Sequence, residues 1–556
     1  MPLSNRLHVS RFFWSLIAAS IALLVVAPMT EVCLYIGQPS DGAWQHLQET
    51  LLGTYLHNTL CLALGVSTGT LVIGVACAWL VTMCHFPGVV IFRWALLLPM
   101  AIPSYLMAYA MTDLFQFSGP VQTGLREAFG WSRSDYWFPE MRSLSGAIAI
   151  LTLTLYPYVY LAARTAFLTQ SLCVLEASRT LGAGPWKSFT RIALPLARPA
   201  IAAGLALVMM ETLAEFGAVD YCAVDTFSTG IYRTWMTRGS LVASAQLSTC
   251  LLLGAALLFV LEAVARGRAH FFHTTGRYRQ IVHWQLSIRN ATVAFLVCLI
   301  PIFFGFLLPT GLFLHMTAFH GDARATELFT ELATNSVIAA LLAGFLACFL
   351  GLMLVYLHRI ANTWATQWCV VLSCLGYAIP GGVIAIGILG FLWRIEDSLA
   401  DFVEHTLHMS APFLLSGTIL PLILGYQTRF LAVPVNFLQA GFTRVQPTVD
   451  DAARILGASR SKQLFRVHTP LIKSSLWASL LFVFIDVIKE LPATLILRPF
   501  DFDTLAVRIY HLASDERLPE ASSSALAIIM VGLLPVFLVT RLLDKSRPGN
   551  SWGSHR

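Results

Sequence analysis

Apolar residues run along this chain in long stretches, and short polar segments separate them. A helix that crosses the hydrocarbon core of a membrane needs about 20 mostly apolar residues. By that measure the pattern predicts membrane-spanning helices near residues 12–36, 55–83, 92–117, 144–168, 197–220, 244–265, 291–315, 333–357, 369–393, 412–436, 474–496 and 521–541. We therefore expect an all-α membrane protein with about 12 transmembrane helices, six in each half.

The composition agrees with this prediction. Hydrophobic residues make up 57% of the chain and charged residues 12%, and the mean hydropathy is +0.70, whereas a soluble protein carries about 25% charged residues. The formal net charge of +6 is modest, so we expect a lipid bilayer rather than nucleic acid as the partner. The first apolar stretch is longer than the core of a signal peptide, about 7–15 residues, and we expect it to be retained as a helix.

Basic residues predict the orientation of the chain, because Lys and Arg concentrate in cytoplasmic loops. They are frequent in segment 269–290 and again after the last apolar stretch, at Arg541, Lys545 and Arg547. Both ends of the chain are therefore expected in the cytoplasm. The 11 cysteines include no C-x-x-C pair, which favours small buried apolar side chains over metal ligands. The sequence does not identify metal-binding residues.

One polar signature occurs twice, 275 residues apart. The first copy begins at Glu176 and the second at Asp451, and in both copies an acid, a glycine and a proline keep the same spacing. Such a repeat indicates two homologous six-helix halves, which we place at 1–268 and 291–556, joined by a basic cytoplasmic linker at 269–290. Because each half has an even number of spans, the halves are expected to be related by a pseudo-two-fold axis along the membrane normal.

Each copy lies in a loop between the fourth and fifth predicted spans of its half, at 172–196 and 447–471. Gly182 and Gly457 can take the left-handed conformation that ends a helix. The pattern therefore predicts a helix-turn-helix elbow on the cytoplasmic side. An amphipathic loop lying on the lipid headgroups is the alternative, and it explains one copy better than two matched copies.

At these residues the chain resembles the membrane permease subunits of ABC importers. Their hallmark is Glu-Ala-Ala, three residues, Gly, nine residues, Ile-x-Leu-Pro, and this loop forms the coupling helix that docks on a cytoplasmic ATPase. The chain departs from the hallmark at Ser178, Asp451, Val467 and Thr469. The resemblance implies coupling roles for Glu176, Ala177, Gly182, Pro195, Asp451, Ala452, Gly457 and Pro470.

The resemblance also implies partners and a location. No G-x-x-x-x-G-K-[ST] phosphate loop occurs in the chain, so we expect a transport subunit that is not itself an enzyme. Two cytoplasmic ATPase subunits would use ATP and Mg, and this chain would bind no cofactor of its own. A periplasmic substrate-binding protein would deliver the cargo to a multi-pass protein of the bacterial inner membrane.

Acidic residues recur inside two predicted spans, again 275 residues apart. Glu211 and Glu215 in the first half match Asp486 and Glu490 in the second. With a spacing of four residues, both acids of a pair are expected on one helix face. Since acids are costly inside a membrane, they either line a path suited to a cation or serve the structure, by pairing with Lys489 or arginines or by capping a broken helix.

Prolines predict breaks in the third and ninth spans. Pro103 and Pro380 stand at corresponding places, and such breaks often mark a pathway or gate. A kink that serves only packing is the alternative. We therefore assign Glu211, Glu215, Asp486, Glu490, Pro103 and Pro380 to a candidate translocation pathway.

The cargo is the least constrained part of the prediction. Fused permeases of this kind resemble ferric iron importers, with thiamine importers second, and carboxylates suit a hard cation. A proton-coupled secondary transporter could use the same acids, but it should lack the duplicated elbow. A membrane enzyme would need a nucleophile or a metal constellation, and no H-x-x-x-H or G-x-S-x-G motif is present.

Overall fold

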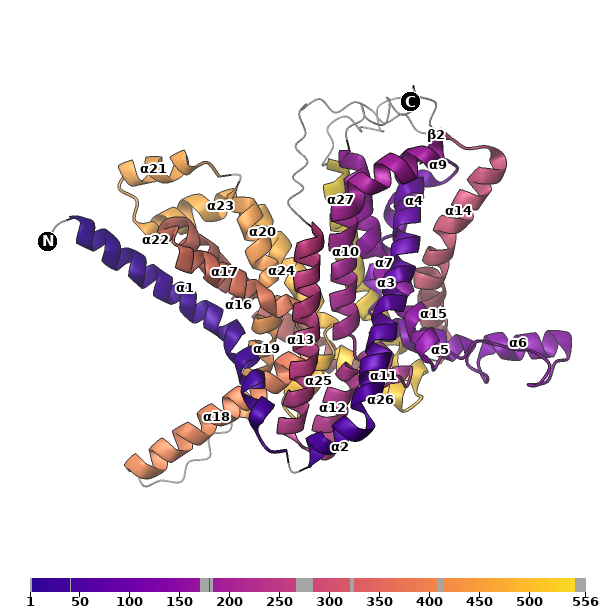
Figure 1. The fold of residues 1–556 in the computed structure, drawn as a ribbon, viewed down its shortest axis with the longest axis horizontal. Helices are drawn as coiled ribbons and strands as arrows, with labels where there is room; N and C mark the ends of the chain where they lie inside the picture. Colours follow the sequence, from indigo (N-terminus) through magenta and orange to yellow (C-terminus); the bar gives the residue numbers. More distant parts are fainter. Residues whose placement is uncertain are drawn as a thin grey trace. The chain divides into compact units, whose positions relative to one another are not determined.

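The computed structural model describes residues 3–40, 42–170, 180, 184–266, 284–320, 325–407, 415–443 and 445–545. Nearly all of these residues are helical (Figure 1). The two strands assigned among them, β1 (Cys84–His85) and β2 (Trp284–Gln285), pair in parallel. In lipid, helices satisfy every backbone group within the segment. The predicted all-α membrane fold class is confirmed.

The chain packs as two compact units, each assembled from separate stretches of sequence. Unit 1 contains the described residues of Met1–Leu51, Gly230–Leu252 and Arg324–Arg508. Unit 2 contains those of Leu52–Thr229, Leu253–Ala323 and Ile509–Arg556. The two units are defined by which residues pack together, whereas the two halves were predicted from the repeat in the sequence. The units therefore do not coincide with the predicted halves.

Unit 1 has helix α1 (Leu3–Leu34) packed against the long helix α16 (Ala325–Ala361), α17 (Trp364–Cys374) and α18 (Gly381–Leu407). Buried Ala18 and Val25 of α1 share a core with Leu354 of α16 and Leu438. The other elements of this unit are η1 (Tyr35–Gly37), α2 (Ala43–Thr50), η5 (Leu375–Ala378), η6 (Leu415–Gly417), α19 (Leu420–Phe430), α20 (Ala432–Phe442), α21 (Pro447–Ile455), α22 (Arg460–Lys462), η7 (Gln463–His468), α23 (Thr469–Leu471), α24 (Lys473–Ile488) and α25 (Pro492–Leu497).

Unit 2 is built around α3 (Leu52–Met83), α7 (Leu144–Thr169) and α10 (Leu194–Ala214), which pack on one another. Helix α27 (Leu518–Lys545), near the end of the sequence, packs here against α15 and η2. The other elements are α4 (Val89–Ala95), η2 (Leu98–Ala101), α5 (Ser104–Phe115), α6 (Pro120–Phe129), α9 (Pro185–Ser188), η3 (Phe189–Ala193), α11 (Gly217–Tyr221), α14 (Ile288–Ile302), η4 (Phe303–Leu307) and α15 (Leu308–His320). Helices α12 (Phe227–Arg238), α13 (Leu241–Arg266) and α26 (Leu505–Ser514) contain boundaries between the units.

Seven helices of the described chain are long and apolar enough to cross a membrane, and the number rises to 10 if each of three bent pairs forms one span. Two predicted spans are missing from this set. The span predicted at 244–265 corresponds to the shorter apolar helix Leu241–Leu257. The span predicted at 412–436 is divided between α19 and α20, because Pro434 has no N–H to bond to the carbonyl of Phe430. The count of 12 stays a prediction.

The predicted proline breaks are confirmed. The chain bends by 93° between Ala101 and Ser104, where Pro103 precedes α5, and by 116° between Ala378 and Gly381, where Pro380 precedes α18. A third bend, of 79°, separates Leu471 from Lys473.

Prolines also explain three short π-helical segments. Segments η3, η4 and η7 each end two residues before a proline, namely Pro195, Pro309 and Pro470. The residue between segment and proline donates its N–H five residues back in each case, as Leu194 does to Phe189. Because proline lacks an N–H and crowds the carbonyl four residues earlier, the preceding turn widens.

Candidate translocation and coupling sites

A similar hydrogen bond occurs once in each unit. In unit 2 the side-chain amide of Asn58 on α3 donates to the carbonyl of Asp225 at 2.9 Å. In unit 1 the amide of Asn335 on α16 donates to the carbonyl of Asp503 at 3.2 Å. Each bond ties the long helix to the chain segment that follows the acidic residues, so the surroundings of those acids can be compared position by position.

Glu215 follows the end of α10, where the backbone turns extended. Its Oε1 accepts from the N–H of Ala218 at 2.9 Å, in the first turn of α11. Its Oε2 accepts from the hydroxyl of Ser104, the first residue of α5. The side chain is half-buried. Glu215 thus supplies the acceptor that the free N–H groups at a helix start require.

Glu490 does the same at the start of α25, with more partners. Its Oε1 accepts from the N–H of Ala493 at 3.0 Å, and its Oε2 accepts from the N–H and the hydroxyl of Thr494 at 2.9 and 2.6 Å. The guanidinium of Arg429 lies 3.6 Å from Oε1, an ion-pair distance too long for a hydrogen bond. Glu490 is 5% exposed, so its charge is held by donors in place of water.

The expectation that each acidic pair shares one helix face is wrong. Helix α10 ends at Ala214 and α24 ends at Ile488, so Glu215 and Glu490 lie beyond the helices that carry Glu211 and Asp486. The physical reason is the short helix that starts directly afterwards and draws each glutamate to its own N–H groups. Asp486 instead pairs with Lys489, with 2.8 Å between Oδ1 and Nζ.

The broken helices position these carboxylates. Pro103 places Ser104 against Glu215, and Pro380 places Gly381 beside Glu490. A Cβ at Gly381 would stand 2.4 Å from an Arg429 nitrogen and 2.8 Å from Glu490 Oε1, so a side chain there would need a rearrangement. The structure therefore brings both predicted prolines next to a predicted acid. No group of three or more His, Cys, Asp or Glu side chains that could hold a metal ion occurs among the described residues.

The second elbow has the predicted helix, turn and helix. Helix α21 ends before Gly457, whose φ is +73°, and the N–H of Gly457 donates to Arg454 while that of Ala458 donates to Ala453. This is the Schellman arrangement in which glycine tolerates the left-handed conformation. Asp451, Ala452 and Pro470 are exposed.

The first elbow is described only in part. Glu176, Ala177 and Gly182 lie outside the described residues. Pro195 stands in the first turn of α10, directly after η3.

Sequence reasoning missed two residues of the second elbow. Ile455 and Leu456, at the end of α21, are each 86% exposed. Two large exposed apolar side chains at the tip of a polar elbow indicate a contact surface. Their position immediately before Gly457, inside a polar segment, was the signal that could have identified them.

Known proteins are similar to part or most of this chain. Residues 70–269 match the family described as the binding-protein-dependent transport system inner membrane component. The chain is 26% identical over 502 residues to the Fe(3+)-transport system permease protein FbpB 2 of Haemophilus influenzae, covering 88% of this chain and 90% of that protein. It is 23% identical to the ferric transport system permease protein FbpB of Actinobacillus pleuropneumoniae, covering 87% of this chain and 70% of that protein.

A shorter similarity covers about a quarter of the chain. The molybdenum transport system permease protein ModB of Escherichia coli is 32% identical over 145 residues, which are 26% of this chain and 60% of that protein. The ferric permeases, by contrast, match along both halves. Part of the chain therefore matches the binding-protein-dependent transport family, and most of its length is similar to the FbpB ferric permeases.

Proposed function

We propose that this protein is the membrane subunit of an ATP-driven importer that carries ferric iron into the cell. The observation that carries the proposal is the exposed elbow at α21, which repeats a signature of the first half in a chain similar along 88% of its length to a ferric permease. A periplasmic binding protein would deliver the iron. Two cytoplasmic ATPase subunits would hydrolyse ATP with Mg, while this chain binds no cofactor and catalyses no reaction.

In the proposed mechanism the two elbows transmit ATP binding to the membrane helices. Asp451, Ile455 and Leu456 offer an acidic and apolar contact surface for an ATPase groove. Closing the ATPase dimer would draw the elbows together and favour an outward-open state, to the extent that ATP binds that state more tightly. Two homologous six-helix halves around a pseudo-two-fold axis, with cytoplasmic termini, are part of this proposal.

The carboxylates would act at two levels. Glu215 and Glu490 hold the starts of α11 and α25 through the hydrogen bonds described above. Glu211 and Asp486, which lie on the preceding helices, are the better candidates for contact with a passing cation. Ferric iron is a hard cation that prefers oxygen ligands, so carboxylates along the path are chemically suited to it.

The cargo can be tested directly. The permease with its ATPase is reconstituted in nanodiscs, and ATP hydrolysis is measured with purified binding protein loaded with ferric iron or with thiamine. We expect stimulation by the iron-loaded protein. Stimulation by the thiamine-loaded protein alone would replace iron by thiamine, and uptake that runs on a proton gradient without any ATPase would replace the importer by a secondary transporter.

Docking needs a separate test. Glu176→Lys and Asp451→Lys together reverse the acid in both elbows, and we expect the ATPase to detach or ATP hydrolysis to continue without uptake. Glu127→Lys on α6, also an exposed acid, is the matched control and should behave as the wild type. Normal assembly and uptake in the double variant would remove the docking role of the elbows.

A further inference from the structure

Three side chains from separate elements meet beneath the second elbow. Arg359, near the end of α16, donates from Nε to Asp450 Oδ2 at 3.0 Å, and its Nη2 lies 2.8 Å from the same oxygen. Its Nη1 and Nη2 also donate to the carbonyls of Phe442 and Val445, each at 3.0 Å. One planar guanidinium thus bonds to the end of α20, to the turn after it and to the first turn of α21.

The other oxygen of Asp450 faces a histidine. His468 Nε2, in η7, lies 2.6 Å from Asp450 Oδ1, close enough for an ion pair though not aligned as a hydrogen bond. The imidazole has no exposed surface and packs between the rings of Tyr356 and Phe442, with centroids 5.6 and 5.5 Å away. Asp450 therefore joins α16 on one side to η7 on the other.

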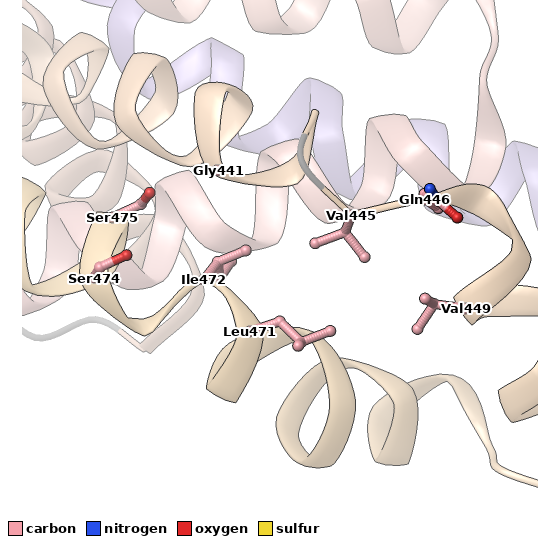
Figure 2. A pocket seen from close by; sticks show the side chains of 8 residues that line it. All are labelled: Gly441, Val445, Gln446, Val449, Leu471, Ile472, Ser474 and Ser475. Carbon is pink, nitrogen blue, oxygen red and sulfur yellow. The ribbon is translucent and has the colours of Figure 1, made fainter. Parts of the chain in front are cut away.

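A cavity shows why apolar packing alone does not hold this elbow. It has a volume of about 310 Å³ and lies where α20, the start of α21 and the bend before α24 meet. Val445 and Val449 line it from the side of α21, and Leu471 and Ile472 face them from the other side (Figure 2). The cavity separates α21 from the bend before α24, so within this chain α21 makes fewer dispersion contacts than a closely packed helix does.

The sequence of the first half has no charged residue at the three positions that correspond to this cluster. At the 275-residue offset of the repeat, Asp450 corresponds to Leu175 and His468 to Ala193, and when Asn58 is aligned with Asn335, Arg359 corresponds to Thr82. None of these three side chains can carry a charge at neutral pH. Aromatic rings occupy the comparable place in unit 2, where Trp79 packs on Phe189 with centroids 4.9 Å apart.

The helices that follow the two elbows differ as well. The helical stretch Trp186–Ala214 counts as one span, whereas its counterpart in the second half is bent by 79° between Leu471 and Lys473. A bend at that point separates the elbow from α24. A rigid connection from the second elbow to the membrane must then pass through another element, and the cluster on α16 offers one.

We propose that Arg359, Asp450 and His468 are positioning residues that connect the second elbow to α16, so that movement of an ATPase docked on this elbow reaches the membrane helices through the cluster. This inference rests on the proposed function, because it assumes that the elbow docks on an ATPase.

The test measures coupling separately from assembly. Asp450→Asn keeps the shape of the side chain and removes its charge. In nanodiscs with ATPase and binding protein, we expect the variant to retain its ATPase subunits and its basal hydrolysis, while the amount of cargo imported per ATP falls about fivefold or more, the lower range of measured coupling factors. Arg517→Gln, which breaks an exposed pair with Glu520, is the control and should leave this ratio unchanged.

Variants of Arg359 test the same connection from its other side. Arg359→Gln should lower the ratio to the same extent, and the double variant with Asp450→Asn should be no worse than either single variant, because both act on one connection. If Asp450→Asn does not yield an assembled complex, Arg359→Lys decides, since lysine keeps the charge but cannot reach Asp450 and both carbonyls together. A reduced ratio in Arg359→Lys then supports the proposal.

A wild-type ratio of import to hydrolysis in assembled Asp450→Asn, or in Arg359→Lys where that variant decides, would overturn the inference. Failure of the proposed function would give a different result. The double variant Glu176→Lys, Asp451→Lys would then dock its ATPase and import cargo normally, whatever ratio Asp450→Asn shows.

Discussion

The starts of α11 and α25 are the same structural element in two units, and they are stabilised by different chemistry. In both, a glutamate accepts the N–H of the alanine three residues later. Around Glu215 the recorded donors are that amide and a serine hydroxyl. Around Glu490 the hydroxyl of Thr494 donates, and the guanidinium of Arg429 lies nearby. The comparison teaches that the same capping bond forms at both helix starts, while the hydroxyl donor comes from another helix at one start and from the same helix at the other.

The segments next to the elbows also differ. In unit 1 Arg359 and Asp450 form an ion pair and His468 lies beside Asp450, whereas among the described residues of unit 2 Trp79 packs on Phe189. A charged cluster holds its members in one geometry and is costly to break, while apolar packing tolerates small shifts. The following predictions test how far the two carboxylate sites differ.

The largest effect is expected from Glu490→Gln. The change leaves Arg429, whose side chain is 14% exposed, without its carboxylate, and breaking a buried pair costs about 3–5 kcal/mol. Thermal unfolding of the purified protein should show a clear loss of stability. Asp401→Asn, at an exposed position of α18, is the control. A loss no greater than that of the control would contradict the buried ion pair.

A smaller effect is expected from Glu215→Gln. Glu215 is only half-buried, whereas Glu490 is 5% exposed. The carboxylate of Glu215 accepts from the hydroxyl of Ser104 and the N–H of Ala218, and an amide oxygen can still accept from one of them. The cost should be about 1–3 kcal/mol, the usual range for an unsatisfied buried group. Thermal unfolding of both glutamine variants compares their losses of stability. A larger loss in Glu215→Gln than in Glu490→Gln would contradict the predicted order.

The double variant Glu490→Gln, Arg429→Gln measures how much the interaction between the two charged side chains contributes to stability. Once both charges are absent, neither is left buried alone, so the loss of stability should be smaller than the sum of the single losses by about 0.5–3 kcal/mol. Chemical or thermal unfolding of all four proteins supplies the cycle. Simple additivity would mean that Arg429 and Glu490 do not interact.

The smallest stability effect is expected at the pair of Asp486 and Lys489. The lysine side chain is 34% exposed, and partly solvated pairs contribute about 0–1 kcal/mol. Lys489→Gln should therefore unfold nearly as the wild type does. Asp486→Asn should be equally stable but should transport less iron if this carboxylate contacts the cargo, and unchanged uptake would restrict Asp486 to a structural role.

Much of the local structure could be predicted because its causes are local. A proline removes a donor wherever it stands, so the breaks at Pro103 and Pro380 followed from their positions. Gly457 ends α21 as expected, because glycine alone takes a left-handed turn without cost. The shared face of Glu211 and Glu215 was predicted wrongly, because helical spacing carries no information about where the helix stops.

The sequence by itself determined the apolar stretches, the duplication and the polar signature of the elbows, since each depends on residues close together in the chain. Only the tertiary structure decided that Glu490 lies beside Arg429 and that Asp450 lies between Arg359 and His468. It also decided that α1 packs in one unit with α16. These contacts join segments tens to hundreds of residues apart, and no periodicity or spacing records them, because burial and charge pairing act through space rather than along the chain.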